Sequence, residues 1–381
     1  MRPHSFEPCA LPPEAEALRL EIRTFLAQAL VDYPRDQRAQ SWMGFDAAFT
    51  KALAARGWIG MTWPKRYGGG DQTAFARYVL VEELLAAGAP VLAHWTADRQ
   101  SGPLLLNYGS EAQKHRFLPA ICRGESYFCI GMSEPDSGSD LAATRTRGVR
   151  TQGGWQVNGT KLWTTNAHRC HYMIALVRTV SGTERHEGLS QLIIDLHSPE
   201  VTVRPIRDLA GEVHFNEVVF NDLFVPDDQL IGVEGNGWEQ VMSELAYERS
   251  GPERYLSTIA LLTELIRVAG RDPGPQIEAA VGRMVAHIVV LRQMSLSVAN
   301  QLQQKKDPLI EAAYVKELGT SFEQMMPEIT HALLDLQPTL EATTDYQRVL
   351  AYITQVAPSF SLRGGTREII RGLIARGLGV R

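Results

Sequence analysis

The sequence predicts an α+β fold, mostly α-helical, in which a central β domain separates an N-terminal helical domain from a C-terminal helical bundle. Apolar residues recur at helical spacing up to about residue 125 and again after about residue 235, whereas the stretch between consists of short runs rich in β-branched and aromatic residues. A chain of 381 residues is long enough for two or three packed units. We therefore expect domains at 1–125, 126–235 and 236–381.

The N-terminal domain is predicted to contain at least three helices. In the first, apolar residues recur at the spacing of one helix face: Leu18, Ile22, Phe25, Leu26 and Ala29. Two further helices, 45–56 and 75–87, are followed by Gly57 and Gly88, respectively. Glycine readily adopts the left-handed conformation that ends many helices, so both helices are expected to stop there.

The middle region is predicted to be a β-barrel or sandwich. Its strand-like runs are 160–165, 172–177, 191–195, 201–206 and 217–220. Asn158-Gly159 lies between two alternating segments, and Asn-Gly favours the primed turns that join hairpin strands. We therefore expect a hairpin turn at Asn158-Gly159.

The C-terminal domain is predicted to be a helical bundle. Helix-period segments are 238–249, 253–269, 276–305, 309–335 and 344–357. Gly251-Pro252 separates the first two, because proline lacks the amide hydrogen that a continuous helix needs.

The overall charge and apolar content exclude several classes of protein. The formal net charge is only −5, without a long block of one sign, so nucleic acid is not an expected partner. The N-terminus lacks the apolar core of a signal peptide, and no apolar stretch is long enough to span a bilayer. We expect a cytoplasmic protein without a membrane span.

The cysteines indicate neither a disulfide framework nor a metal site. Cys9, Cys122, Cys129 and Cys170 form no CxxC pair, so reduced thiols are expected. His168 and His171 flank Cys170, but a zinc site needs three or four ligands and no second cluster accompanies them. No metal is therefore predicted.

Two polar motifs in the middle region are candidates for a ligand site. The first is SEPDSGSD at 133–140, whose hydroxyls and turn amides could hold a phosphate or the edge of a flavin. The second is NGTKLWTTN at 158–166, which places Trp163 near the end of a strand. Either motif alone also fits a polar loop or a core tryptophan.

Together, in this order and separation, the two motifs resemble the acyl-CoA dehydrogenase family, whose β domain carries (T/S)EPxxGSD followed by NGxKxW(I/T)TN. The resemblance continues in GWIGMTWPKRYGGG, YGSEAQKHRFLPAICRGE, VEGNGW and GGTREIIRGLIAR, so it covers nearly the whole chain. It implies an FAD-dependent oxidoreductase that removes hydrogens from the α and β carbons of an acyl-CoA thioester.

The resemblance also implies which residues contact FAD. Met132 and Ser133 would lie against the isoalloxazine ring, Trp163 and Thr165 would frame its dimethylbenzene side and N5, and Ser139 would reach the pyrophosphate. In the C-terminal motif, Thr366 and Glu368 are also expected to bind the cofactor.

The catalytic base departs from the family's commonest pattern. Many members carry a glutamate immediately before the Gly-Thr of the C-terminal motif, where this chain has Gly364. A second branch carries the glutamate in a Leu-x-x-Glu-Arg setting after the β domain, which Glu248 matches. Glu248 is the candidate base, and the Gly364 amide is expected to polarise the thioester carbonyl. The alternative is that Glu248 is a surface carboxylate paired with Arg254 or with a lysine or arginine elsewhere.

Two cofactor motifs of the family are missing. RxxFG with its downstream glutamine is not recognisable in 267–284, and 329–337 stands where QxxGGxG is expected. The adenine end of FAD would then be held differently or by another chain. Four hypotheses follow: a dehydrogenase acting alone, one subunit of a heteromeric dehydrogenase, a flavin-free structural subunit, or a flavin oxidase or monooxygenase.

The resemblance implies partners as well as chemistry. Electron-transfer flavoprotein is the expected electron acceptor, and assembly into a homo- or heterotetramer is expected. Apolar helical segments such as 277–298 could form the subunit contacts. A bulky or branched acyl group is favoured, because two glycines in place of the loop glutamate would leave space above the flavin.

Overall fold

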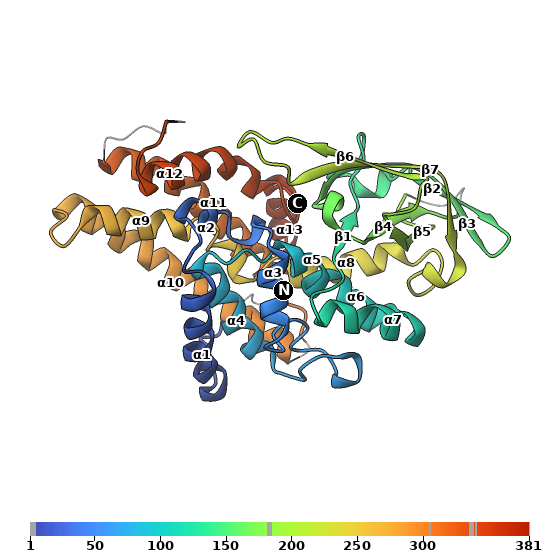
Figure 1. The fold of residues 1–381 in the computed structure, drawn as a ribbon, viewed down its shortest axis with the longest axis horizontal. Helices are drawn as coiled ribbons and strands as arrows, with labels where there is room; N and C mark the ends of the chain where they lie inside the picture. Colours follow the sequence, from blue (N-terminus) through green and yellow to red (C-terminus); the bar gives the residue numbers. More distant parts are fainter. Residues whose placement is uncertain (1–4, 181–184, 305, 335–338, 340, 381) are drawn as a thin grey trace. The chain divides into compact units, whose positions relative to one another are not determined.

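The computed structural model describes residues 5–180, 185–304, 306–334, 339 and 341–380, except for the side chains of 244–248 (Figure 1). It confirms the predicted fold class, with helical N- and C-terminal regions and a central curled sheet. Contacts group the chain into two compact units. Unit 1 comprises 1–44, 72–90 and 246–381, and unit 2 comprises 45–71 and 91–245. The division at about residues 125 and 235 remains a prediction.

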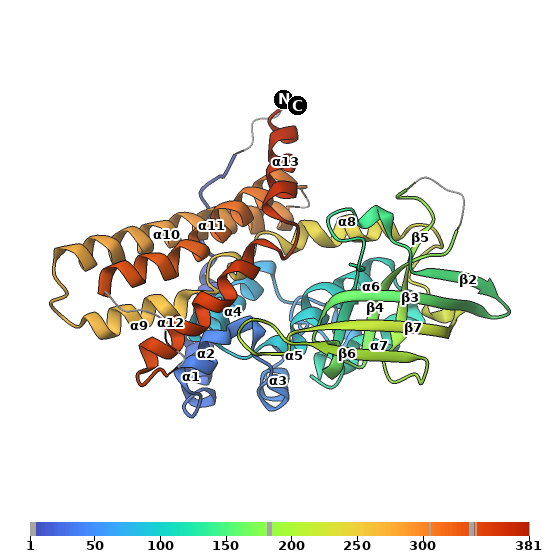
Figure 2. The same cartoon turned by 90° about the horizontal axis from the view of Figure 1, so that it is seen from above.

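Unit 1 is helical, and α10 packs against α11 within it (Figure 2). Its described helices are α1 (Pro13–Ala29), α2 (Arg35–Gln40), α4 (Ala74–Ala87), α9 (Ile259–Ala269), α10 (Pro275–Gln303), α11 (Leu309–Leu334), α12 (Asp345–Val356) and α13 (Arg367–Gly377), with the 3-10 segments η1 (Ser41–Met43), η7 (Pro252–Arg254) and η8 (Ala357–Ser361). The predicted helices agree within a few residues, except that 253–269 begins with η7 and a turn. Gly88 caps α4 at φ +70°, as predicted.

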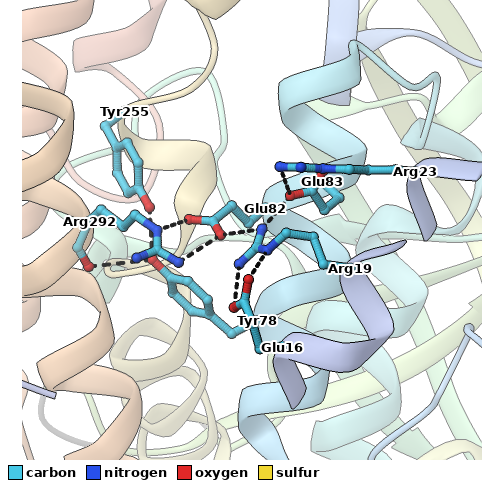
Figure 3. Close-up of polar contacts among 8 residues, drawn as sticks. All are labelled: Glu16, Arg19, Arg23, Tyr78, Glu82, Glu83, Tyr255 and Arg292. Atoms are coloured by element: carbon cyan, nitrogen blue, oxygen red, sulfur yellow. Dashed lines mark hydrogen bonds and ion pairs between the residues drawn. The ribbon is translucent and has the colours of Figure 1, made fainter. Parts of the chain in front are cut away.

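Buried charges connect α1, α4 and α10 of unit 1 (Figure 3). Glu82 accepts hydrogen bonds from Arg19 at 3.0 Å and from two nitrogens of Arg292 at 2.5 and 3.1 Å. Glu83 pairs with Arg19 and with Arg23. Because each carboxylate has cationic partners, these acids can be buried in the interior of the bundle.

Unit 2 contains the sheet and the helices around it. Its described helices are α3 (Ala47–Ala54), α5 (Leu92–Thr96), α6 (Gly102–Tyr108) and α7 (Glu111–Cys122), with the shorter segments η2 (Lys65–Tyr67), η3 (Ala97–Ser101), η4 (Leu141–Ala143), η5 (Ala167–Arg169) and η6 (Asp227–Gln229). α8 (Gly237–Glu248) begins in unit 2 and ends in unit 1.

The strands of unit 2 form a seven-stranded sheet in the order β1-β4-β2-β3-β7-β6, with β5 paired to β4. They are β1 (Phe128–Gly131), β2 (Arg147–Thr151), β3 (Gly154–Thr165), β4 (Tyr172–Arg178), β5 (Leu189–Asp195), β6 (Val201–Ile206) and β7 (Phe215–Pro226). Trp155, Val157 and Met173 belong to the apolar core on the sheet. Each predicted strand segment falls within one of β3 to β7.

The predicted hairpin turn at Asn158-Gly159 is wrong. Both residues lie inside β3, where the pairing with β7 shifts register between Val157 and Gly159. The Asn158 side chain bonds Asp222 in β7, and a Cβ at Gly159 would lie 2.5 Å from the Thr146 hydroxyl. The glycine therefore allows a bulge and a close strand approach, two other common uses of glycine in a strand. The β2–β3 hairpin turn instead contains Gly153, at φ +76°.

The histidines and cysteines of unit 2 serve other partners. His168 Nδ1 lies 3.0 Å from Asn216 Oδ1, and the amide of Tyr127 donates to His171 Nδ1 at 3.0 Å. All four cysteines are free thiols, as predicted, and Cys122, Cys129 and Cys170 are buried. Within the described residues there is no group of three or more side chains that could hold a metal ion.

None of the described helices is both long and apolar enough to cross a membrane.

Acidification is expected to destabilise unit 2. Burial lowers the pKa of His168, His171 and His214 below the ordinary value of 6.5. The unfolded chain then binds protons that the folded chain does not, so stability is lost as the pH falls below about 6.5. We expect the thermal midpoint to fall between about pH 7.5 and pH 5.5. His214→Gln should make this decrease smaller, and an unchanged pH dependence in that variant would contradict the assignment.

Candidate functional site

The first half of the predicted site is the loop that leaves β1. β1 ends at Gly131, where a Cβ would lie 2.4 Å from Met173 Sδ, so a larger residue would require the Met173 side chain to move. Met132 and Ser133 follow and are partly exposed. The amide of Leu162 donates to the Ser133 carbonyl at 2.8 Å, which fixes the start of the loop to β3.

The SEPDSGSD motif is a turn closed by its own backbone. Glu134 and Ser137 exchange two backbone hydrogen bonds, at 2.7 and 3.1 Å, and the Ser137 hydroxyl donates to the Asp140 carbonyl at 2.9 Å. Ser139 lies at the exposed side of this turn. The structure thus leaves its hydroxyl accessible, as a pyrophosphate contact would require.

A buried ion pair lies under this loop. Lys161 of β3 is 0% exposed, and its Nζ is 2.8 Å from Glu134 Oε1 and 3.1 Å from the Met132 carbonyl. Burial lowers the pKa of Lys161 to about 8, although Glu134 opposes the shift. Burial raises the pKa of Glu134, but the Lys161 charge and hydrogen bonds from Lys161, Arg145 and Thr146 outweigh it and leave that pKa below its usual value.

Sequence reasoning missed the Lys161–Glu134 pair, although a signal was present. Trp155 and Val157 point to the core, and the alternation of a strand predicts the same side for Lys161. A lysine on a core face requires a buried acceptor, and Glu134 in the preceding motif supplies it.

Trp163 is not a core aromatic. Its side chain is exposed, with 56% of its surface accessible, and it contacts the ring of Phe215 edge-on at a centroid distance of 6.0 Å. The residue has φ +59° at a second register shift between β3 and β7, a conformation that is uncommon for a bulky side chain. Thr165 lies two residues further along β3 and is partly buried. An exposed tryptophan held by an unusual backbone fits a ligand-covering role.

The second half of the predicted site is the turn before α13. Gly364 and Gly365 have φ of +65° and +97°, in the left-handed region that favours glycine. Arg249 Nε donates to the Gly364 carbonyl at 3.3 Å, and Lys316 Nζ donates to the Gly365 carbonyl. Both cations are buried, at 4% and 1% exposure. They fix the turn from its carbonyl side.

Arg363, the residue immediately before Gly364, also anchors this turn. It donates to Glu323 Oε2 at 3.0 Å and to the Ser257 hydroxyl at 2.8 Å, and its guanidinium lies 4.6 Å from the Trp42 ring centroid. Burial raises the pKa of Glu323, while the charge of Arg363 opposes the shift. These contacts connect the turn to Ser257, to Glu323 of α11 and to Trp42 within unit 1.

Glu248 is the last residue of α8, and its side chain lies outside the described residues. The side chain of its neighbour Arg249 contacts Gly364, so the two positions at which the family carries a base lie in the same part of unit 1. The alternative partner, Arg254, is 1% exposed and has its Nε 3.8 Å from Glu253.

Thr366 and Glu368 lie at the start of α13. Thr366 is the N-cap residue, and Glu368 is exposed in the first turn. Hydrogen bonds from the Glu368 backbone amide and the Thr366 hydroxyl hold the Glu368 pKa below its usual value. The residues predicted for the site are thus divided, with Met132, Ser133, Ser139, Trp163 and Thr165 in unit 2 and Glu248, Gly364, Thr366 and Glu368 in unit 1.

Comparison with known sequences identifies two domains of one family. Residues 12–125 match "Acyl-CoA dehydrogenase, N-terminal domain" and residues 129–223 match "Acyl-CoA dehydrogenase, middle domain". Acyl-CoA dehydrogenase IpdE1 of Mycolicibacterium smegmatis is 31% identical over 95% of this chain and 96% of its own length. Acyl-CoA dehydrogenase FadE34 of Mycobacterium tuberculosis is 30% identical over 86% of this chain, but that match spans only 45% of FadE34.

A solved structure agrees with the sequence matches. A chain of the ChsE4-ChsE5 complex from Mycobacterium tuberculosis superimposes with a TM-score of 0.84 at 27% identity, covering 98% of this chain and 100% of that one.

Proposed function

Because the chain belongs to the acyl-CoA dehydrogenase family, we propose that it binds FAD and catalyses the α,β-dehydrogenation of an acyl-CoA thioester. The observation that carries the cofactor assignment is that the Met132-Ser133 loop is bonded to β3 at Leu162, the residue before the exposed Trp163. A preformed loop with accessible hydroxyls and an exposed aromatic side chain fits a flavin. FAD, when bound, would accept the β hydrogen of the substrate as a hydride.

The protein itself would remove the α proton. Glu248 is proposed as the base, supported by its position at the end of α8 immediately before Arg249, which contacts the Gly364 turn. The Gly364 amide is proposed to donate to the thioester carbonyl, which makes the α proton more acidic. A turn fixed by Arg249, Lys316 and Arg363 would keep that amide in place without reorganisation during the reaction.

A heteromeric enzyme is the second candidate. The family's RxxFG and QxxGGxG motifs are missing from 267–284 and 329–337, which favours an adenine end of the FAD site that is completed by another chain. The structurally similar ChsE4-ChsE5 is itself a complex of two different proteins, which supports this proposal. Electron-transfer flavoprotein is the proposed electron acceptor in either case.

Flavin content distinguishes these possibilities. Protein purified alone should be yellow if the chain holds FAD by itself, and it should become yellow only after co-expression with a homologous subunit if the site is shared. Protein that stays colourless under both conditions would favour the flavin-free structural subunit. Rapid reoxidation of the reduced flavin by oxygen alone would favour an oxidase or a monooxygenase.

Trp163→Ala is expected to weaken FAD binding without unfolding the protein. The ring is exposed, so its removal leaves no core cavity, while the loss of one aromatic contact should raise the dissociation constant of FAD about tenfold. Flavin fluorescence on dilution measures the change. Val149→Ala, at another exposed apolar residue of the sheet, is the matched control and should retain FAD. Equal FAD affinity in wild type and Trp163→Ala would remove this residue from the site.

A further inference from the structure

Lys161 is buried at a position where packing does not require a charge. Its side chain is 0% exposed, and burying an ion pair generally contributes little net stability compared with an apolar residue of similar size. A methionine would fill a similar volume without the cost of desolvation. The Lys161 charge is therefore better explained by the groups that it binds than by its contribution to stability.

The hydrogen bonds of Lys161 and Glu134 join β3 to one loop. Lys161 Nζ bonds the Met132 carbonyl and Glu134 Oε1. Glu134 Oε1 also accepts from the amide of Thr146 at 2.9 Å, and Oε2 accepts from the amide of Arg145 at 2.7 Å. One lysine and one carboxylate thus fix both the beginning and the end of the loop 132–146.

From this arrangement we infer that Lys161 and Glu134 are positioning residues that hold the loop 132–146 in its FAD-binding conformation. The inference rests on the proposed function, because it assigns FAD to Met132 and Ser133. Neither charged group needs to touch the cofactor. Lys161 holds the Met132 carbonyl in place. The backbone conformation at Met132 in turn sets the position of the Ser133 side chain.

Neutralising either partner should weaken FAD binding. Lys161→Met and Glu134→Gln should each raise the dissociation constant of FAD on the order of tenfold or more, because each leaves the remaining buried charge without its opposite partner. The double variant Glu134→Gln/Lys161→Met leaves no unpaired charge. Its dissociation constant for FAD should therefore rise by less than the product of the fold-increases in the two single variants. The absorption spectrum of the bound flavin should shift in both single variants.

An exposed ion pair between β2 and η6 provides the control. Arg150 and Asp227 pair at 2.5 Å, with 54% and 49% of their side chains exposed. Arg150→Met and Asp227→Asn should leave FAD affinity and the flavin spectrum unchanged.

Hydrogen exchange tests the loop without the cofactor. In flavin-free protein, the amides of Arg145 and Thr146 should exchange faster in Lys161→Met and in Glu134→Gln than in wild type, because the bonds to Glu134 are weakened. Glu134→Gln serves as the second variant if Lys161→Met does not fold.

The outcomes separate this inference from the proposed function. Single variants that lower the unfolding midpoint but keep the wild-type FAD affinity, flavin spectrum and amide exchange would overturn the positioning role. Wild-type protein that takes up no FAD, alone or with a co-expressed homologue, would instead contradict the proposed function. If the wild type takes up no FAD, amide exchange in the flavin-free protein still tests the role of Lys161 and Glu134. Unchanged exchange in the variants would overturn that role, and faster exchange would support the ordering of the loop 132–146 by these two residues.

Discussion

Glu248→Gln is expected to slow the reduction of bound flavin by a competent acyl-CoA about a hundredfold or more, because the variant cannot accept the α proton. FAD should remain bound, since the carboxylate is proposed to face the substrate. Anaerobic rapid mixing with absorbance detection measures the rate.

A control on the same helix separates the proposed base from a general change in α8. Glu239→Gln alters an exposed carboxylate in the first turn of α8 and should reduce flavin at the wild-type rate. Reduction by Glu248→Gln at an unchanged rate would exclude Glu248 as the base. That result would favour the alternative interpretation of Glu248 as a surface carboxylate.

Glu82→Gln is expected to destabilise unit 1 by about 3 kcal/mol, because it removes a buried carboxylate shared by Arg19 and Arg292 (Figure 3). Glutamine has a single acceptor oxygen and no charge, so it cannot replace the three bonds of Glu82. The thermal midpoint should fall by roughly 5 °C in a chain of this size. Scanning fluorimetry at a fixed heating rate measures the shift.

Glu16 provides the matched control for Glu82. It also bonds Arg19, but 51% of its side chain is exposed. Glu16→Gln should cost less than about 1 kcal/mol, because solvent screens an exposed pair. Equal shifts in the two variants would contradict the importance of burial in this network.

The sequence was sufficient for most of the fold, because helix and strand periodicities are local properties. The apolar repeat at Leu18, Ile22 and Phe25 predicted α1, and Gly88 predicted the end of α4. The Asn158-Gly159 prediction failed for a non-local reason. The turn preference of the dipeptide is overridden by pairing of β3 with β7 and by the close approach of Thr146, neither of which is visible in the local sequence.

The candidate site could be predicted only in part. Motif similarity selected the loop around Ser133 and the Gly364 turn as candidates, but it did not predict the buried cations that contact them. Lys161 was open to prediction from strand alternation, whereas the contact of Arg249 with Gly364 joins residues 115 positions apart and needs the folded chain. The exposure of Trp163 also depends on its backbone conformation, since a tryptophan in a strand is more often buried.

Anaerobic titration of the flavin-loaded wild-type protein with a panel of acyl-CoA thioesters is the decisive test of the proposed dehydrogenase activity. We expect the oxidised flavin absorption band to disappear with at least one thioester and to return when electron-transfer flavoprotein is added. A panel of straight-chain, branched and ring-bearing thioesters that leaves the band of a fully loaded protein unchanged would contradict this activity.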